Sequence, residues 1–214
     1  AYASFRPQYP PALFDWLAAN SPAHGRALDI ACGNGQASAP LRHHFRQILA
    51  CDGSPQQLHA APDLAGIDCF AADATALPLT DSCLDLIVVA QALHWFATPA
   101  FFAEVRRLLR PDGLFCAWCY SLLRLDTELD SVLDDFYWNT LDGYWPAGRA
   151  SVDAGYQDIQ PPFARIAVPA FAIQLEWDLQ QLLGYLGTWS AVQRLEQASG
   201  RDPLQELQPR LRQA

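Results

Sequence analysis

A stretch near the start of the chain most constrains its fold. Residues 28–36 have the sequence Leu-Asp-Ile-Ala-Cys-Gly-Asn-Gly-Gln, which predicts a buried strand that ends in an acid and turns through two glycines into a helix. A second acidic strand end follows at Asp52, before Gly53 and Ser54. A strand, a glycine turn, a helix and an acidic strand end form half of a nucleotide-binding α/β unit.

The position of Asp29 indicates the charge of the ligand. A carboxylate directly before the glycine turn would repel a pyrophosphate but suits a ligand that is positively charged there. S-adenosylmethionine, which carries an ammonium and a sulfonium, is such a ligand. The second acid, Asp52, has the chemistry to chelate both hydroxyls of a ribose.

Composition excludes several classes of partner. The net charge of −9 argues against binding to nucleic acid, because a phosphate backbone requires clustered Lys and Arg. No apolar run approaches the roughly 20 residues of a membrane helix, and the chain has no signal-like start, so we expect a cytoplasmic protein that does not contact membranes. The sequence starts without Met and contains none, which suggests that it is not a complete gene product.

The six cysteines are predicted to be structural thiols rather than metal ligands. Five lie in or beside apolar runs, where a free thiol packs as a small hydrophobe: Cys32, Cys51, Cys69, Cys83 and Cys116. Cys116 and Cys119 have CxxC spacing, but residues three apart on a strand point to opposite faces and cannot share a metal.

Strands and helices alternate over the first 120 residues, which predicts a parallel sheet with right-handed crossovers. The expected strands span residues 27–32, 47–51, 67–71, 83–90 and 114–120, and the helices between them include 36–45, 54–61 and 98–109. Beyond them we expect a helix over 126–138, a sixth strand within 163–177, and helices over 179–198 and after 202–203. The fold class is therefore α/β: a Rossmann-like, doubly wound, mostly parallel sheet with helices on both faces and a helical, aromatic cap.

We divide the chain into three regions. Residues 1–121 form the cofactor-binding core, with residues 1–20 as a lid segment. Residues 122–165 form a cap with the substrate region, and residues 166–214 contribute a C-terminal strand and helices to the same domain.

The expected site lies where the parallel strands end, because ligands of open parallel sheets bind outside the carboxyl ends of the strands. Besides Asp29 and Asp52, these ends carry Asp73, whose carboxylate can accept a hydrogen bond from an adenine amino group, and His94 beside Trp95. We expect these side chains to converge on one crevice.

This ordered set of motifs resembles the class I S-adenosylmethionine-dependent methyltransferases, and more narrowly their small-molecule branch, which includes trans-aconitate methyltransferase-like proteins. The matching segments are residues 28–35, 52–54, 72–74, 91–96 and 104–113, with looser similarity at 2–10 and 188–192. The resemblance implies S-adenosylmethionine as cofactor and S-adenosylhomocysteine as product.

The resemblance also implies roles for individual residues. Asp52, with Gly53 and Ser54, would hold the ribose, and Asp73 with Ala74 would face adenine. The remaining implied contacts are to the methionine portion and the walls of the site, from Asp29, Ala31, Cys32, Gly33, Asn34, Gly35, Gln91 and Ala92, and from Tyr2 and Arg6 if the lid folds over.

Two departures from the family pattern stand out. The family usually has Gly where this chain has Ala31, which brings a methyl group close to the cofactor. The family also closes its sheet with a final antiparallel strand, which nothing after Leu211 can supply, so we expect that strand to be missing.

Methyl transfer to a small-molecule acceptor needs mainly in-line positioning in a dry pocket, and a base only where the acceptor must lose a proton. His94 is the catalytic candidate, and the alternative is a structural histidine that holds its loop. The candidate substrate-binding residues are Trp95, Trp118, Tyr120, Tyr144, Trp145 and Arg149. Arg6 and Arg149 would suit an anionic acceptor such as a carboxylic acid.

Two other functions stay open. The chain would also fit a cofactor-binding subunit or regulator that no longer catalyses, which Ala31 and the short ends favour. A nicotinamide dehydrogenase is the third hypothesis, but Ser38 replaces the third glycine of the dinucleotide fingerprint and Asp29 would oppose the pyrophosphate.

Overall fold

The structure is a computed structural model that describes residues 6–60 and 66–214. Its contacts group these residues into two compact units. The core unit comprises residues 8–120 and 151–173, and the second, here called the helical unit, comprises residues 6–7, 121–150 and 174–214. Residues 151–173 thus pack with the core, and residues 174–214 group with most of the segment expected as a cap. The expected division into functional regions stays a prediction.

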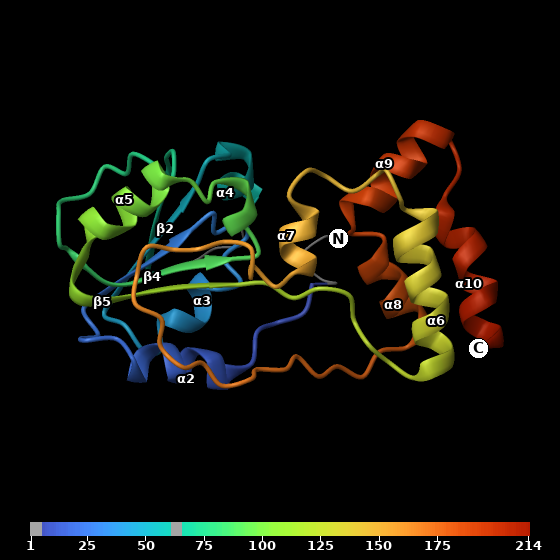
Figure 1. The fold of residues 1–214 in the computed structure, drawn as a ribbon, viewed down its shortest axis with the longest axis horizontal. Coiled ribbons are helices and arrows are strands. Elements are labelled where there is room, and N and C mark those ends of the chain that lie inside the picture. The colour runs from blue at the N-terminus through green and yellow to red at the C-terminus, as the bar shows by residue number, and fades with distance from the viewer. Residues whose placement is uncertain (1–5, 61–65) are drawn as a thin grey trace. The chain divides into compact units, whose positions relative to one another are not determined.

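The core unit is built on one parallel sheet, which confirms the predicted fold class (Figure 1). Its described strands are β1 (Arg26–Ile30), β2 (Gln47–Asp52), β3 (Ile67–Ala71), β4 (Leu84–Ala90) and β5 (Leu109–Trp118). Their order in the sheet is β3-β2-β1-β4-β5, so the direction of strand addition reverses between β1 and β4. Such a reversal is where open α/β sheets bind ligands.

Helices cover both faces of this sheet. They are α2 (Pro11–Ala19), α3 (Ser38–Leu41), α4 (Pro55–Ala60), the short 3₁₀ helix η1 (Leu93–Trp95) and α5 (Pro99–Leu108). Figure 1 shows α2 and α3 on one side of the sheet and α4 and α5 on the other. The N-cap of α5 is Thr98, whose Oγ1 accepts a hydrogen bond from the Phe101 amide at 3.2 Å.

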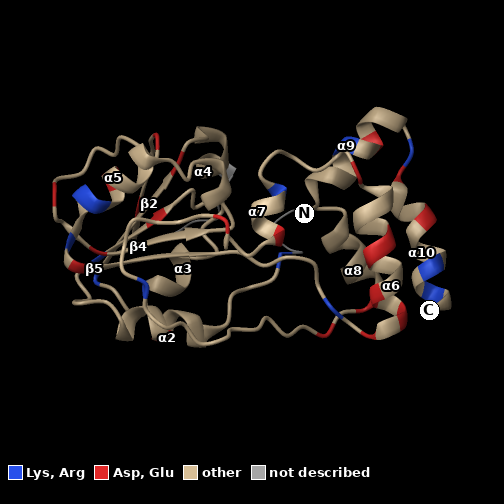
Figure 2. Ribbon diagram, in the orientation of Figure 1, with Lys and Arg blue, Asp and Glu red and all other residues tan. Residues whose placement is uncertain are grey.

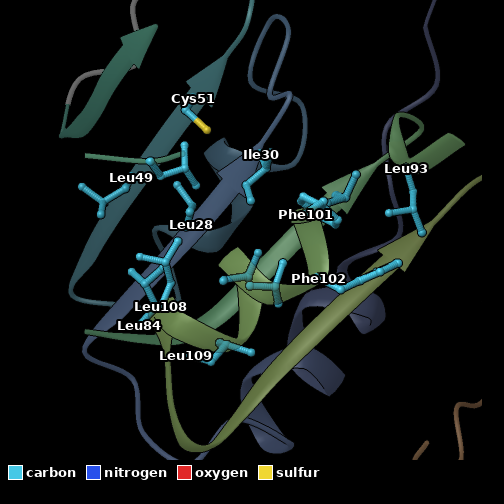
Figure 3. Packing of buried hydrophobic residues seen from close by; sticks show 14 of the residues in the cluster. Leu28, Ile30, Leu49, Cys51, Leu84, Leu93, Phe101, Phe102, Leu108 and Leu109 are labelled. Atoms are coloured by element: carbon cyan, nitrogen blue, oxygen red, sulfur yellow. The ribbon is translucent and has the colours of Figure 1, made fainter. Parts of the chain in front are cut away.

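Burial on both faces explains the nearly continuous apolar sequence of β4. Ile87 and Val89 point into the cluster under α5, whereas Leu86 and Val88 point into the cluster under α2 and α3. Neighbouring residues of a strand face opposite sides, and both sides are covered here. Figure 3 shows the α5 side, where side chains from β1, β2 and α5 meet.

The helical unit contains α6 (Thr127–Asp135), the π-helical turn η2 (Phe136–Thr140), α8 (Leu179–Leu186), α9 (Ser190–Ser199) and α10 (Pro203–Gln213). A further short helix, α7 (Arg149–Asp153), spans the boundary between the units. Asp126 caps α6 by accepting hydrogen bonds from the amides of Glu128 and Leu129. Both α6 and α10 carry charged residues (Figure 2), and Arg210 donates to Asp135 at 2.7 Å.

Two predicted elements are wrong or shortened. The predicted sixth strand within residues 163–177 is absent from the described structure, where the segment is irregular and packs only Phe163, Phe171 and Ile173 against the core clusters. Its alternating sequence reflects these anchors rather than pairing in a sheet. The predicted helix over 36–45 is reduced to α3. The described strand pairs are all parallel.

Most of the cysteines pack as their sequence positions predict: Cys32, Cys51 and Cys83 are buried and Cys116 is half-buried, whereas Cys69 is exposed. Cys116 packs on the α2 side of the sheet and Cys119 on the α5 side, so the CxxC pair is split between two faces. Burial raises the pKa of both Cys51 and Cys116 to about 12, which keeps these thiols protonated. Within the described residues no group of three His, Cys, Asp or Glu side chains is arranged to hold a metal.

A membrane crossing would need a long apolar helix. In the described part of the chain, no helix meets that requirement.

The buried carboxylate of Asp85 ties three elements together at the amino end of the sheet. One oxygen accepts hydrogen bonds from the amides of Gly25 and Arg26, both at 2.8 Å, and the other accepts from Arg110 at 2.7 Å. An amide in place of the carboxylate would keep the first oxygen and turn donors toward Arg110. Asp85→Asn is therefore expected to lower the free energy of unfolding by about 2 kcal/mol.

Chemical denaturation measures this effect. Asp81→Asn is the matched control, because the Asp81 side chain is 75% exposed and its ion pair with Arg107 is worth less than about 1 kcal/mol. Equal losses in the two variants would contradict the structural role of Asp85.

Candidate functional site

The turn after β1 brings its backbone to the carboxyl ends of β1 and β2. Three of its residues have left-handed backbone: Ala31 at φ 57°, Gly33 at φ 53° and Gly35 at φ 82°. The Gly33 amide donates to the Asp52 carboxylate at 3.0 Å. A Cβ built on Gly33 would meet nothing within 4 Å, so there is open space above the turn for a ligand. Cys32 is buried in this turn and Asn34 is half-buried.

Asp52 at the end of β2 organises its surroundings. Its second carboxylate oxygen accepts a hydrogen bond from the Ser54 amide at 2.9 Å, so both oxygens face backbone N–H groups. Each oxygen still has a lone pair to offer a ligand hydroxyl. Gly53 lies between Asp52 and Ser54 in the sequence. A Cβ built on Gly53 would approach only the carbonyl oxygen of Ala72, at 4.0 Å.

Asp29 lies fully buried in β1, beneath the turn. Its Oδ2 accepts a hydrogen bond from the hydroxyl of Ser38 at 2.5 Å, whereas its Oδ1 makes none. Burial raises the pKa of Asp29 from 3.8 to about 7, against the opposing effect of the Ser38 hydrogen bonds and with a smaller contribution from the charge of Asp52. A positive group at the turn would restore the ionised carboxylate.

The loop after β3 carries the third acid. Asp73 is exposed, and its Oδ1 accepts hydrogen bonds from the amide and hydroxyl of Thr75 at 2.7 and 2.6 Å, which lower its pKa. Ala74 lies between them and packs against the core. The Ala72 amide bonds the carbonyl of Asp52 at 3.2 Å, which places the start of this loop beside the end of β2.

The same loop is held to α5 by two residues that the sequence analysis did not single out. Glu104 accepts a hydrogen bond from the Leu77 amide at 2.7 Å, and Arg107 donates to the carbonyls of Leu77 and Leu79 at 3.1 and 2.8 Å. Glu104 and Arg107 also bind each other through two hydrogen bonds. Their spacing of three residues on a helix was the available signal.

The ends of β4 and β5 are joined through Gln91. Its backbone N–H donates a hydrogen bond to the carbonyl of Trp118 at 2.9 Å. Its side-chain oxygen accepts one from the backbone N–H of Tyr120 at 3.3 Å. Gln91 has φ 62°, so the two central strands β1 and β4 both end near a non-glycine residue in left-handed backbone. Such strain clusters at functional sites. Ala92 follows and packs against the α5-side core.

Tyr9 is an additional residue at this edge. Its ring lies 5.4 Å from that of Trp118 and 6.4 Å from that of Tyr120. Burial is the main cause that raises the pKa of Tyr9 far above its ordinary value, and Asp29 adds to this, while the side chains of Gln91 and Trp118 lower it. Tyr9 therefore stays protonated, and its ring contacts place it beside Trp118 at the end of β5.

His94 and Trp95 lie in η1, directly after β4. The Nδ1 of His94 is 3.2 Å from the hydroxyl of Tyr156, and Trp95 is 59% exposed with its ring 4.8 Å from the imidazole. The structure thus places an exposed indole and an anchored imidazole at the same end of the sheet as the three acids.

The remaining candidate residues belong to the helical unit. Arg6 donates to the carbonyl of Thr188 at 3.3 Å and lies over the Tyr185 ring. Arg149 donates to the Tyr137 hydroxyl and stacks on the Trp145 ring, with its guanidinium carbon 4.6 Å from the ring centroid. Tyr144 is half-buried in the same unit, and Tyr2 lies outside the described residues.

The core-unit residues fit S-adenosylmethionine on three observations. Space is open above Gly33 and Gly53, Asp52 has lone pairs to spare, and Asp29 has a buried oxygen without a partner. The open space at the two glycines suits close approach of a ligand, and the spare lone pairs of Asp52 suit a pair of ribose hydroxyls. The buried oxygen of Asp29 suits the positively charged amino-acid end of the cofactor.

Comparisons with known proteins agree with this geometry. The methyltransferase domain family matches residues 28–117. A Dictyostelium discoideum protein named "Putative methyltransferase" is 30% identical over 100% of this chain and 83% of its own length. An Anaeromyxobacter dehalogenans structure described as a "Putative Type II Methyltransferase" is 41% identical and superposes with a TM-score of 0.90 over 97% of this chain and 88% of the other.

A third relative matches about half of the chain. An "Uncharacterized methyltransferase" of Mycobacterium tuberculosis is 35% identical over 53% of this chain and 46% of its own length. The chain belongs to the class I S-adenosylmethionine-dependent methyltransferases. It is therefore an enzyme of the transferase class, and S-adenosylmethionine is the cofactor that its family implies.

The strained Ala31 gives a direct test of the turn. A non-glycine residue in left-handed backbone costs about 1–2 kcal/mol, so Ala31→Gly is expected to stabilise the chain by about 1 kcal/mol and to strengthen binding of S-adenosylhomocysteine a few-fold. Thermal unfolding and calorimetry measure the two effects.

The control is Ala37→Gly, at φ −88° and ψ −37°, where glycine relieves no strain. It is expected to destabilise the chain instead, since Ala37 is also buried. A loss of stability in Ala31→Gly would mean that the backbone of the turn differs from the one described.

Proposed function

We propose that the chain transfers the methyl group of S-adenosylmethionine to a small-molecule acceptor, as in the branch that includes trans-aconitate methyltransferase-like proteins. The observation that carries this proposal is the set of three acids, Asp29, Asp52 and Asp73, at the carboxyl ends of β1, β2 and β3, beside open space at two glycines. The set matches a cofactor with a cationic end, a ribose and an adenine.

Each acid receives one part of the cofactor in this proposal. Asp52 holds the ribose hydroxyls and Asp73, with Ala74, faces the adenine. The turn from Ala31 to Gly35 approaches the methionine portion, and Asp29 beneath it provides a buried countercharge for the ammonium. Gln91 and Ala92 line the site next to β4, and Arg6 and Tyr2 are proposed to reach the methionine carboxylate.

When bound, the cofactor supplies a methyl group on a sulfonium, which is already a good leaving centre. The protein then has to hold the acceptor in line and exclude water. We propose that Trp95, Trp118 and Tyr120 form an aromatic wall for the acceptor, because aromatic faces attract the cationic methyl donor and pack against apolar substrates. Trp95 suits this role because more than half of its surface is exposed.

A carboxylic acid acceptor would need a cation. Arg149, with Tyr144 and Trp145 near it in sequence, is the candidate for this purpose, and its stacking on Trp145 leaves the guanidinium with a fixed orientation. For an acceptor of that alternative class, we propose this group as the anchor of the carboxylate. Arg149→Ala would then raise KM for carboxylate acceptors and leave the affinity for S-adenosylhomocysteine unchanged.

The test is methyl transfer itself. The chain is incubated with S-adenosylmethionine labelled in its methyl group and with a panel of small phenols, amines and carboxylates. We expect label in at least one acceptor, and none with Asp52→Ala. Binding of S-adenosylhomocysteine without transfer to any member of the panel would favour the non-catalytic cofactor-binding protein.

A further inference from the structure

We propose that Tyr156 is a positioning residue that orients His94 as a general base, and that the acceptor is therefore a molecule with a hydroxyl or amine proton to lose. The inference rests on the methyl transfer proposed above and names the class of its acceptor. Its basis is a contact between residues 62 positions apart in the sequence.

The imidazole of His94 contacts two other aromatic side chains, those of Tyr156 and Trp95. Its Nδ1 lies 3.2 Å from the Tyr156 hydroxyl, and the two ring centroids are 6.0 Å apart. Trp95 contributes a second ring at 4.8 Å. Since η1 follows β4 directly, this anchored imidazole sits at the edge of the sheet where the cofactor and acceptor are proposed to bind.

Tyr156 is itself fixed in place. It is 8% exposed and belongs to the core cluster under α5. Its backbone is left-handed at φ 60°, a conformation that is unfavourable for a residue other than glycine. The amide of Tyr156 bonds the carbonyl of Ser151 at 2.8 Å, and the Ser151 hydroxyl bonds Asp158 at 2.5 Å. The loop is thus built to present the phenol in one place.

The role of general base determines which ring nitrogen of His94 must carry a hydrogen. A histidine that accepts a proton on Nε2 carries hydrogens on both nitrogens, and the hydrogen on Nδ1 needs an acceptor. The oxygen of Tyr156 is that acceptor. Before the reaction, the same bond from Nδ1–H to Tyr156 favours the tautomer in which Nε2 carries no hydrogen and is the basic nitrogen.

The proton then has a defined path. The heteroatom of the acceptor forms its bond to the methyl carbon, and the carbon–sulfur bond breaks with its electron pair going to sulfur. The proton of the acceptor passes to Nε2 of His94. The products are the methylated acceptor, the neutral thioether and an imidazolium that water deprotonates.

A base of this kind selects among acceptors. A carboxylic acid with a pKa of about 4 is already ionised at neutral pH and gains nothing from a base. The acids Asp29, Asp52 and Asp73 at the same sheet edge also disfavour an anion. A weakly acidic hydroxyl or an amine is neutral or cationic on arrival and has a proton to give, so the site favours a phenol or amine over a carboxylate.

The first test needs no knowledge of the natural acceptor. Nitrogen-15 NMR of the histidine rings reports which nitrogen of His94 carries the hydrogen. We expect Nδ1–H in the wild-type chain and a shift toward Nε2–H in Tyr156→Phe, which removes only the hydroxyl. The exposed His43 in the same spectrum is the internal control and is expected to remain unchanged. Nε2–H in the wild type, or the same tautomer in both proteins, would overturn the role of Tyr156.

The second test addresses the acceptor class. With S-adenosylhomocysteine bound, catechol is titrated as the phenol probe and phenylacetate as the carboxylate probe, and the Nε2 resonance of His94 is followed. A shift with catechol is expected, and its absence overturns the acceptor class. Failure of the wild type to bind S-adenosylhomocysteine would overturn the proposed function, whereas a wrong tautomer with intact binding overturns this inference alone.

Discussion

Asp52→Ala is expected to weaken binding of S-adenosylhomocysteine by at least about 100-fold. The carboxylate is proposed to accept hydrogen bonds from two ribose hydroxyls, and each charge-assisted bond is worth roughly 1.5–3 kcal/mol. The substitution also removes the acceptor for the Gly33 and Ser54 amides, which loosens the turn that approaches the cofactor. Calorimetric titration measures the loss.

The matched control is Asp68→Ala. Asp68 lies on the neighbouring strand β3 and accepts a hydrogen bond from Gln47 at 2.8 Å, so it resembles Asp52 in charge and in bonding but lies away from the carboxyl end of the sheet. Its removal is expected to change the affinity less than about threefold, through long-range charge alone. An Asp52→Ala variant that remains folded and binds S-adenosylhomocysteine as tightly as the Asp68→Ala variant would contradict the proposed ribose site.

Asp29→Asn is expected to have opposite effects on binding and on stability. Because the pKa of buried Asp29 is raised to about 7, the wild-type carboxylate gains its charge only as pH rises through that value. The affinity for S-adenosylhomocysteine, whose ammonium is proposed to face this charge, should rise from pH 6 to pH 8. In Asp29→Asn the affinity is expected to be lower, by about tenfold at pH 8, and to lose this rise.

The same pKa has the reverse consequence for the ligand-free protein. Between pH 3.8 and about 7 the unfolded chain releases the Asp29 proton while the folded chain keeps it, so the cost of burying this group grows over that window and is complete above it. Asn carries no such cost and still accepts the hydrogen bond from Ser38. Asp29→Asn is therefore expected to be more stable than the wild type above pH 7, by up to about 4 kcal/mol.

Urea denaturation at pH 5 and pH 8 separates these cases. The gain in stability of Asp29→Asn over the wild type should be larger at pH 8 than at pH 5. At pH 8 the variant should nevertheless bind S-adenosylhomocysteine more weakly than the wild type does. If Asp29→Asn were less stable than the wild type at pH 8, the carboxylate would be ionised and well paired in the ligand-free protein, contrary to the environment described for it.

Local patterns predicted the parts of the fold that depend on neighbours in sequence. The apolar run of β4 and the acids at the ends of β1 and β2 identified a parallel sheet and its ligand edge, because strand burial and glycine turns leave signatures within a few residues. The Ser54-Pro55 and Thr98-Pro99 pairs marked the starts of α4 and α5 for the same reason.

Long-range packing decided the parts that the sequence predicted less well. Tyr156 contacts His94 because residues 151–173 return to the core, and no local pattern marks that return. The alternation in residues 163–177 resembled a strand, yet without a partner strand it supplies only anchors such as Phe171, which packs on Trp16. Asp29 was recognised from its position, but its raised pKa follows from complete burial, which the hydrogen bonds from Ser38 offset only in part, and only the folded chain reveals this environment.

The measurement that tests the central claim most directly is a calorimetric titration of the folded chain with S-adenosylhomocysteine, with NAD as the competing ligand. The proposed site predicts one molecule bound per chain with micromolar affinity and no detectable binding of NAD. Binding of NAD in place of S-adenosylhomocysteine, or of neither, would contradict the assignment of the three acids to this cofactor.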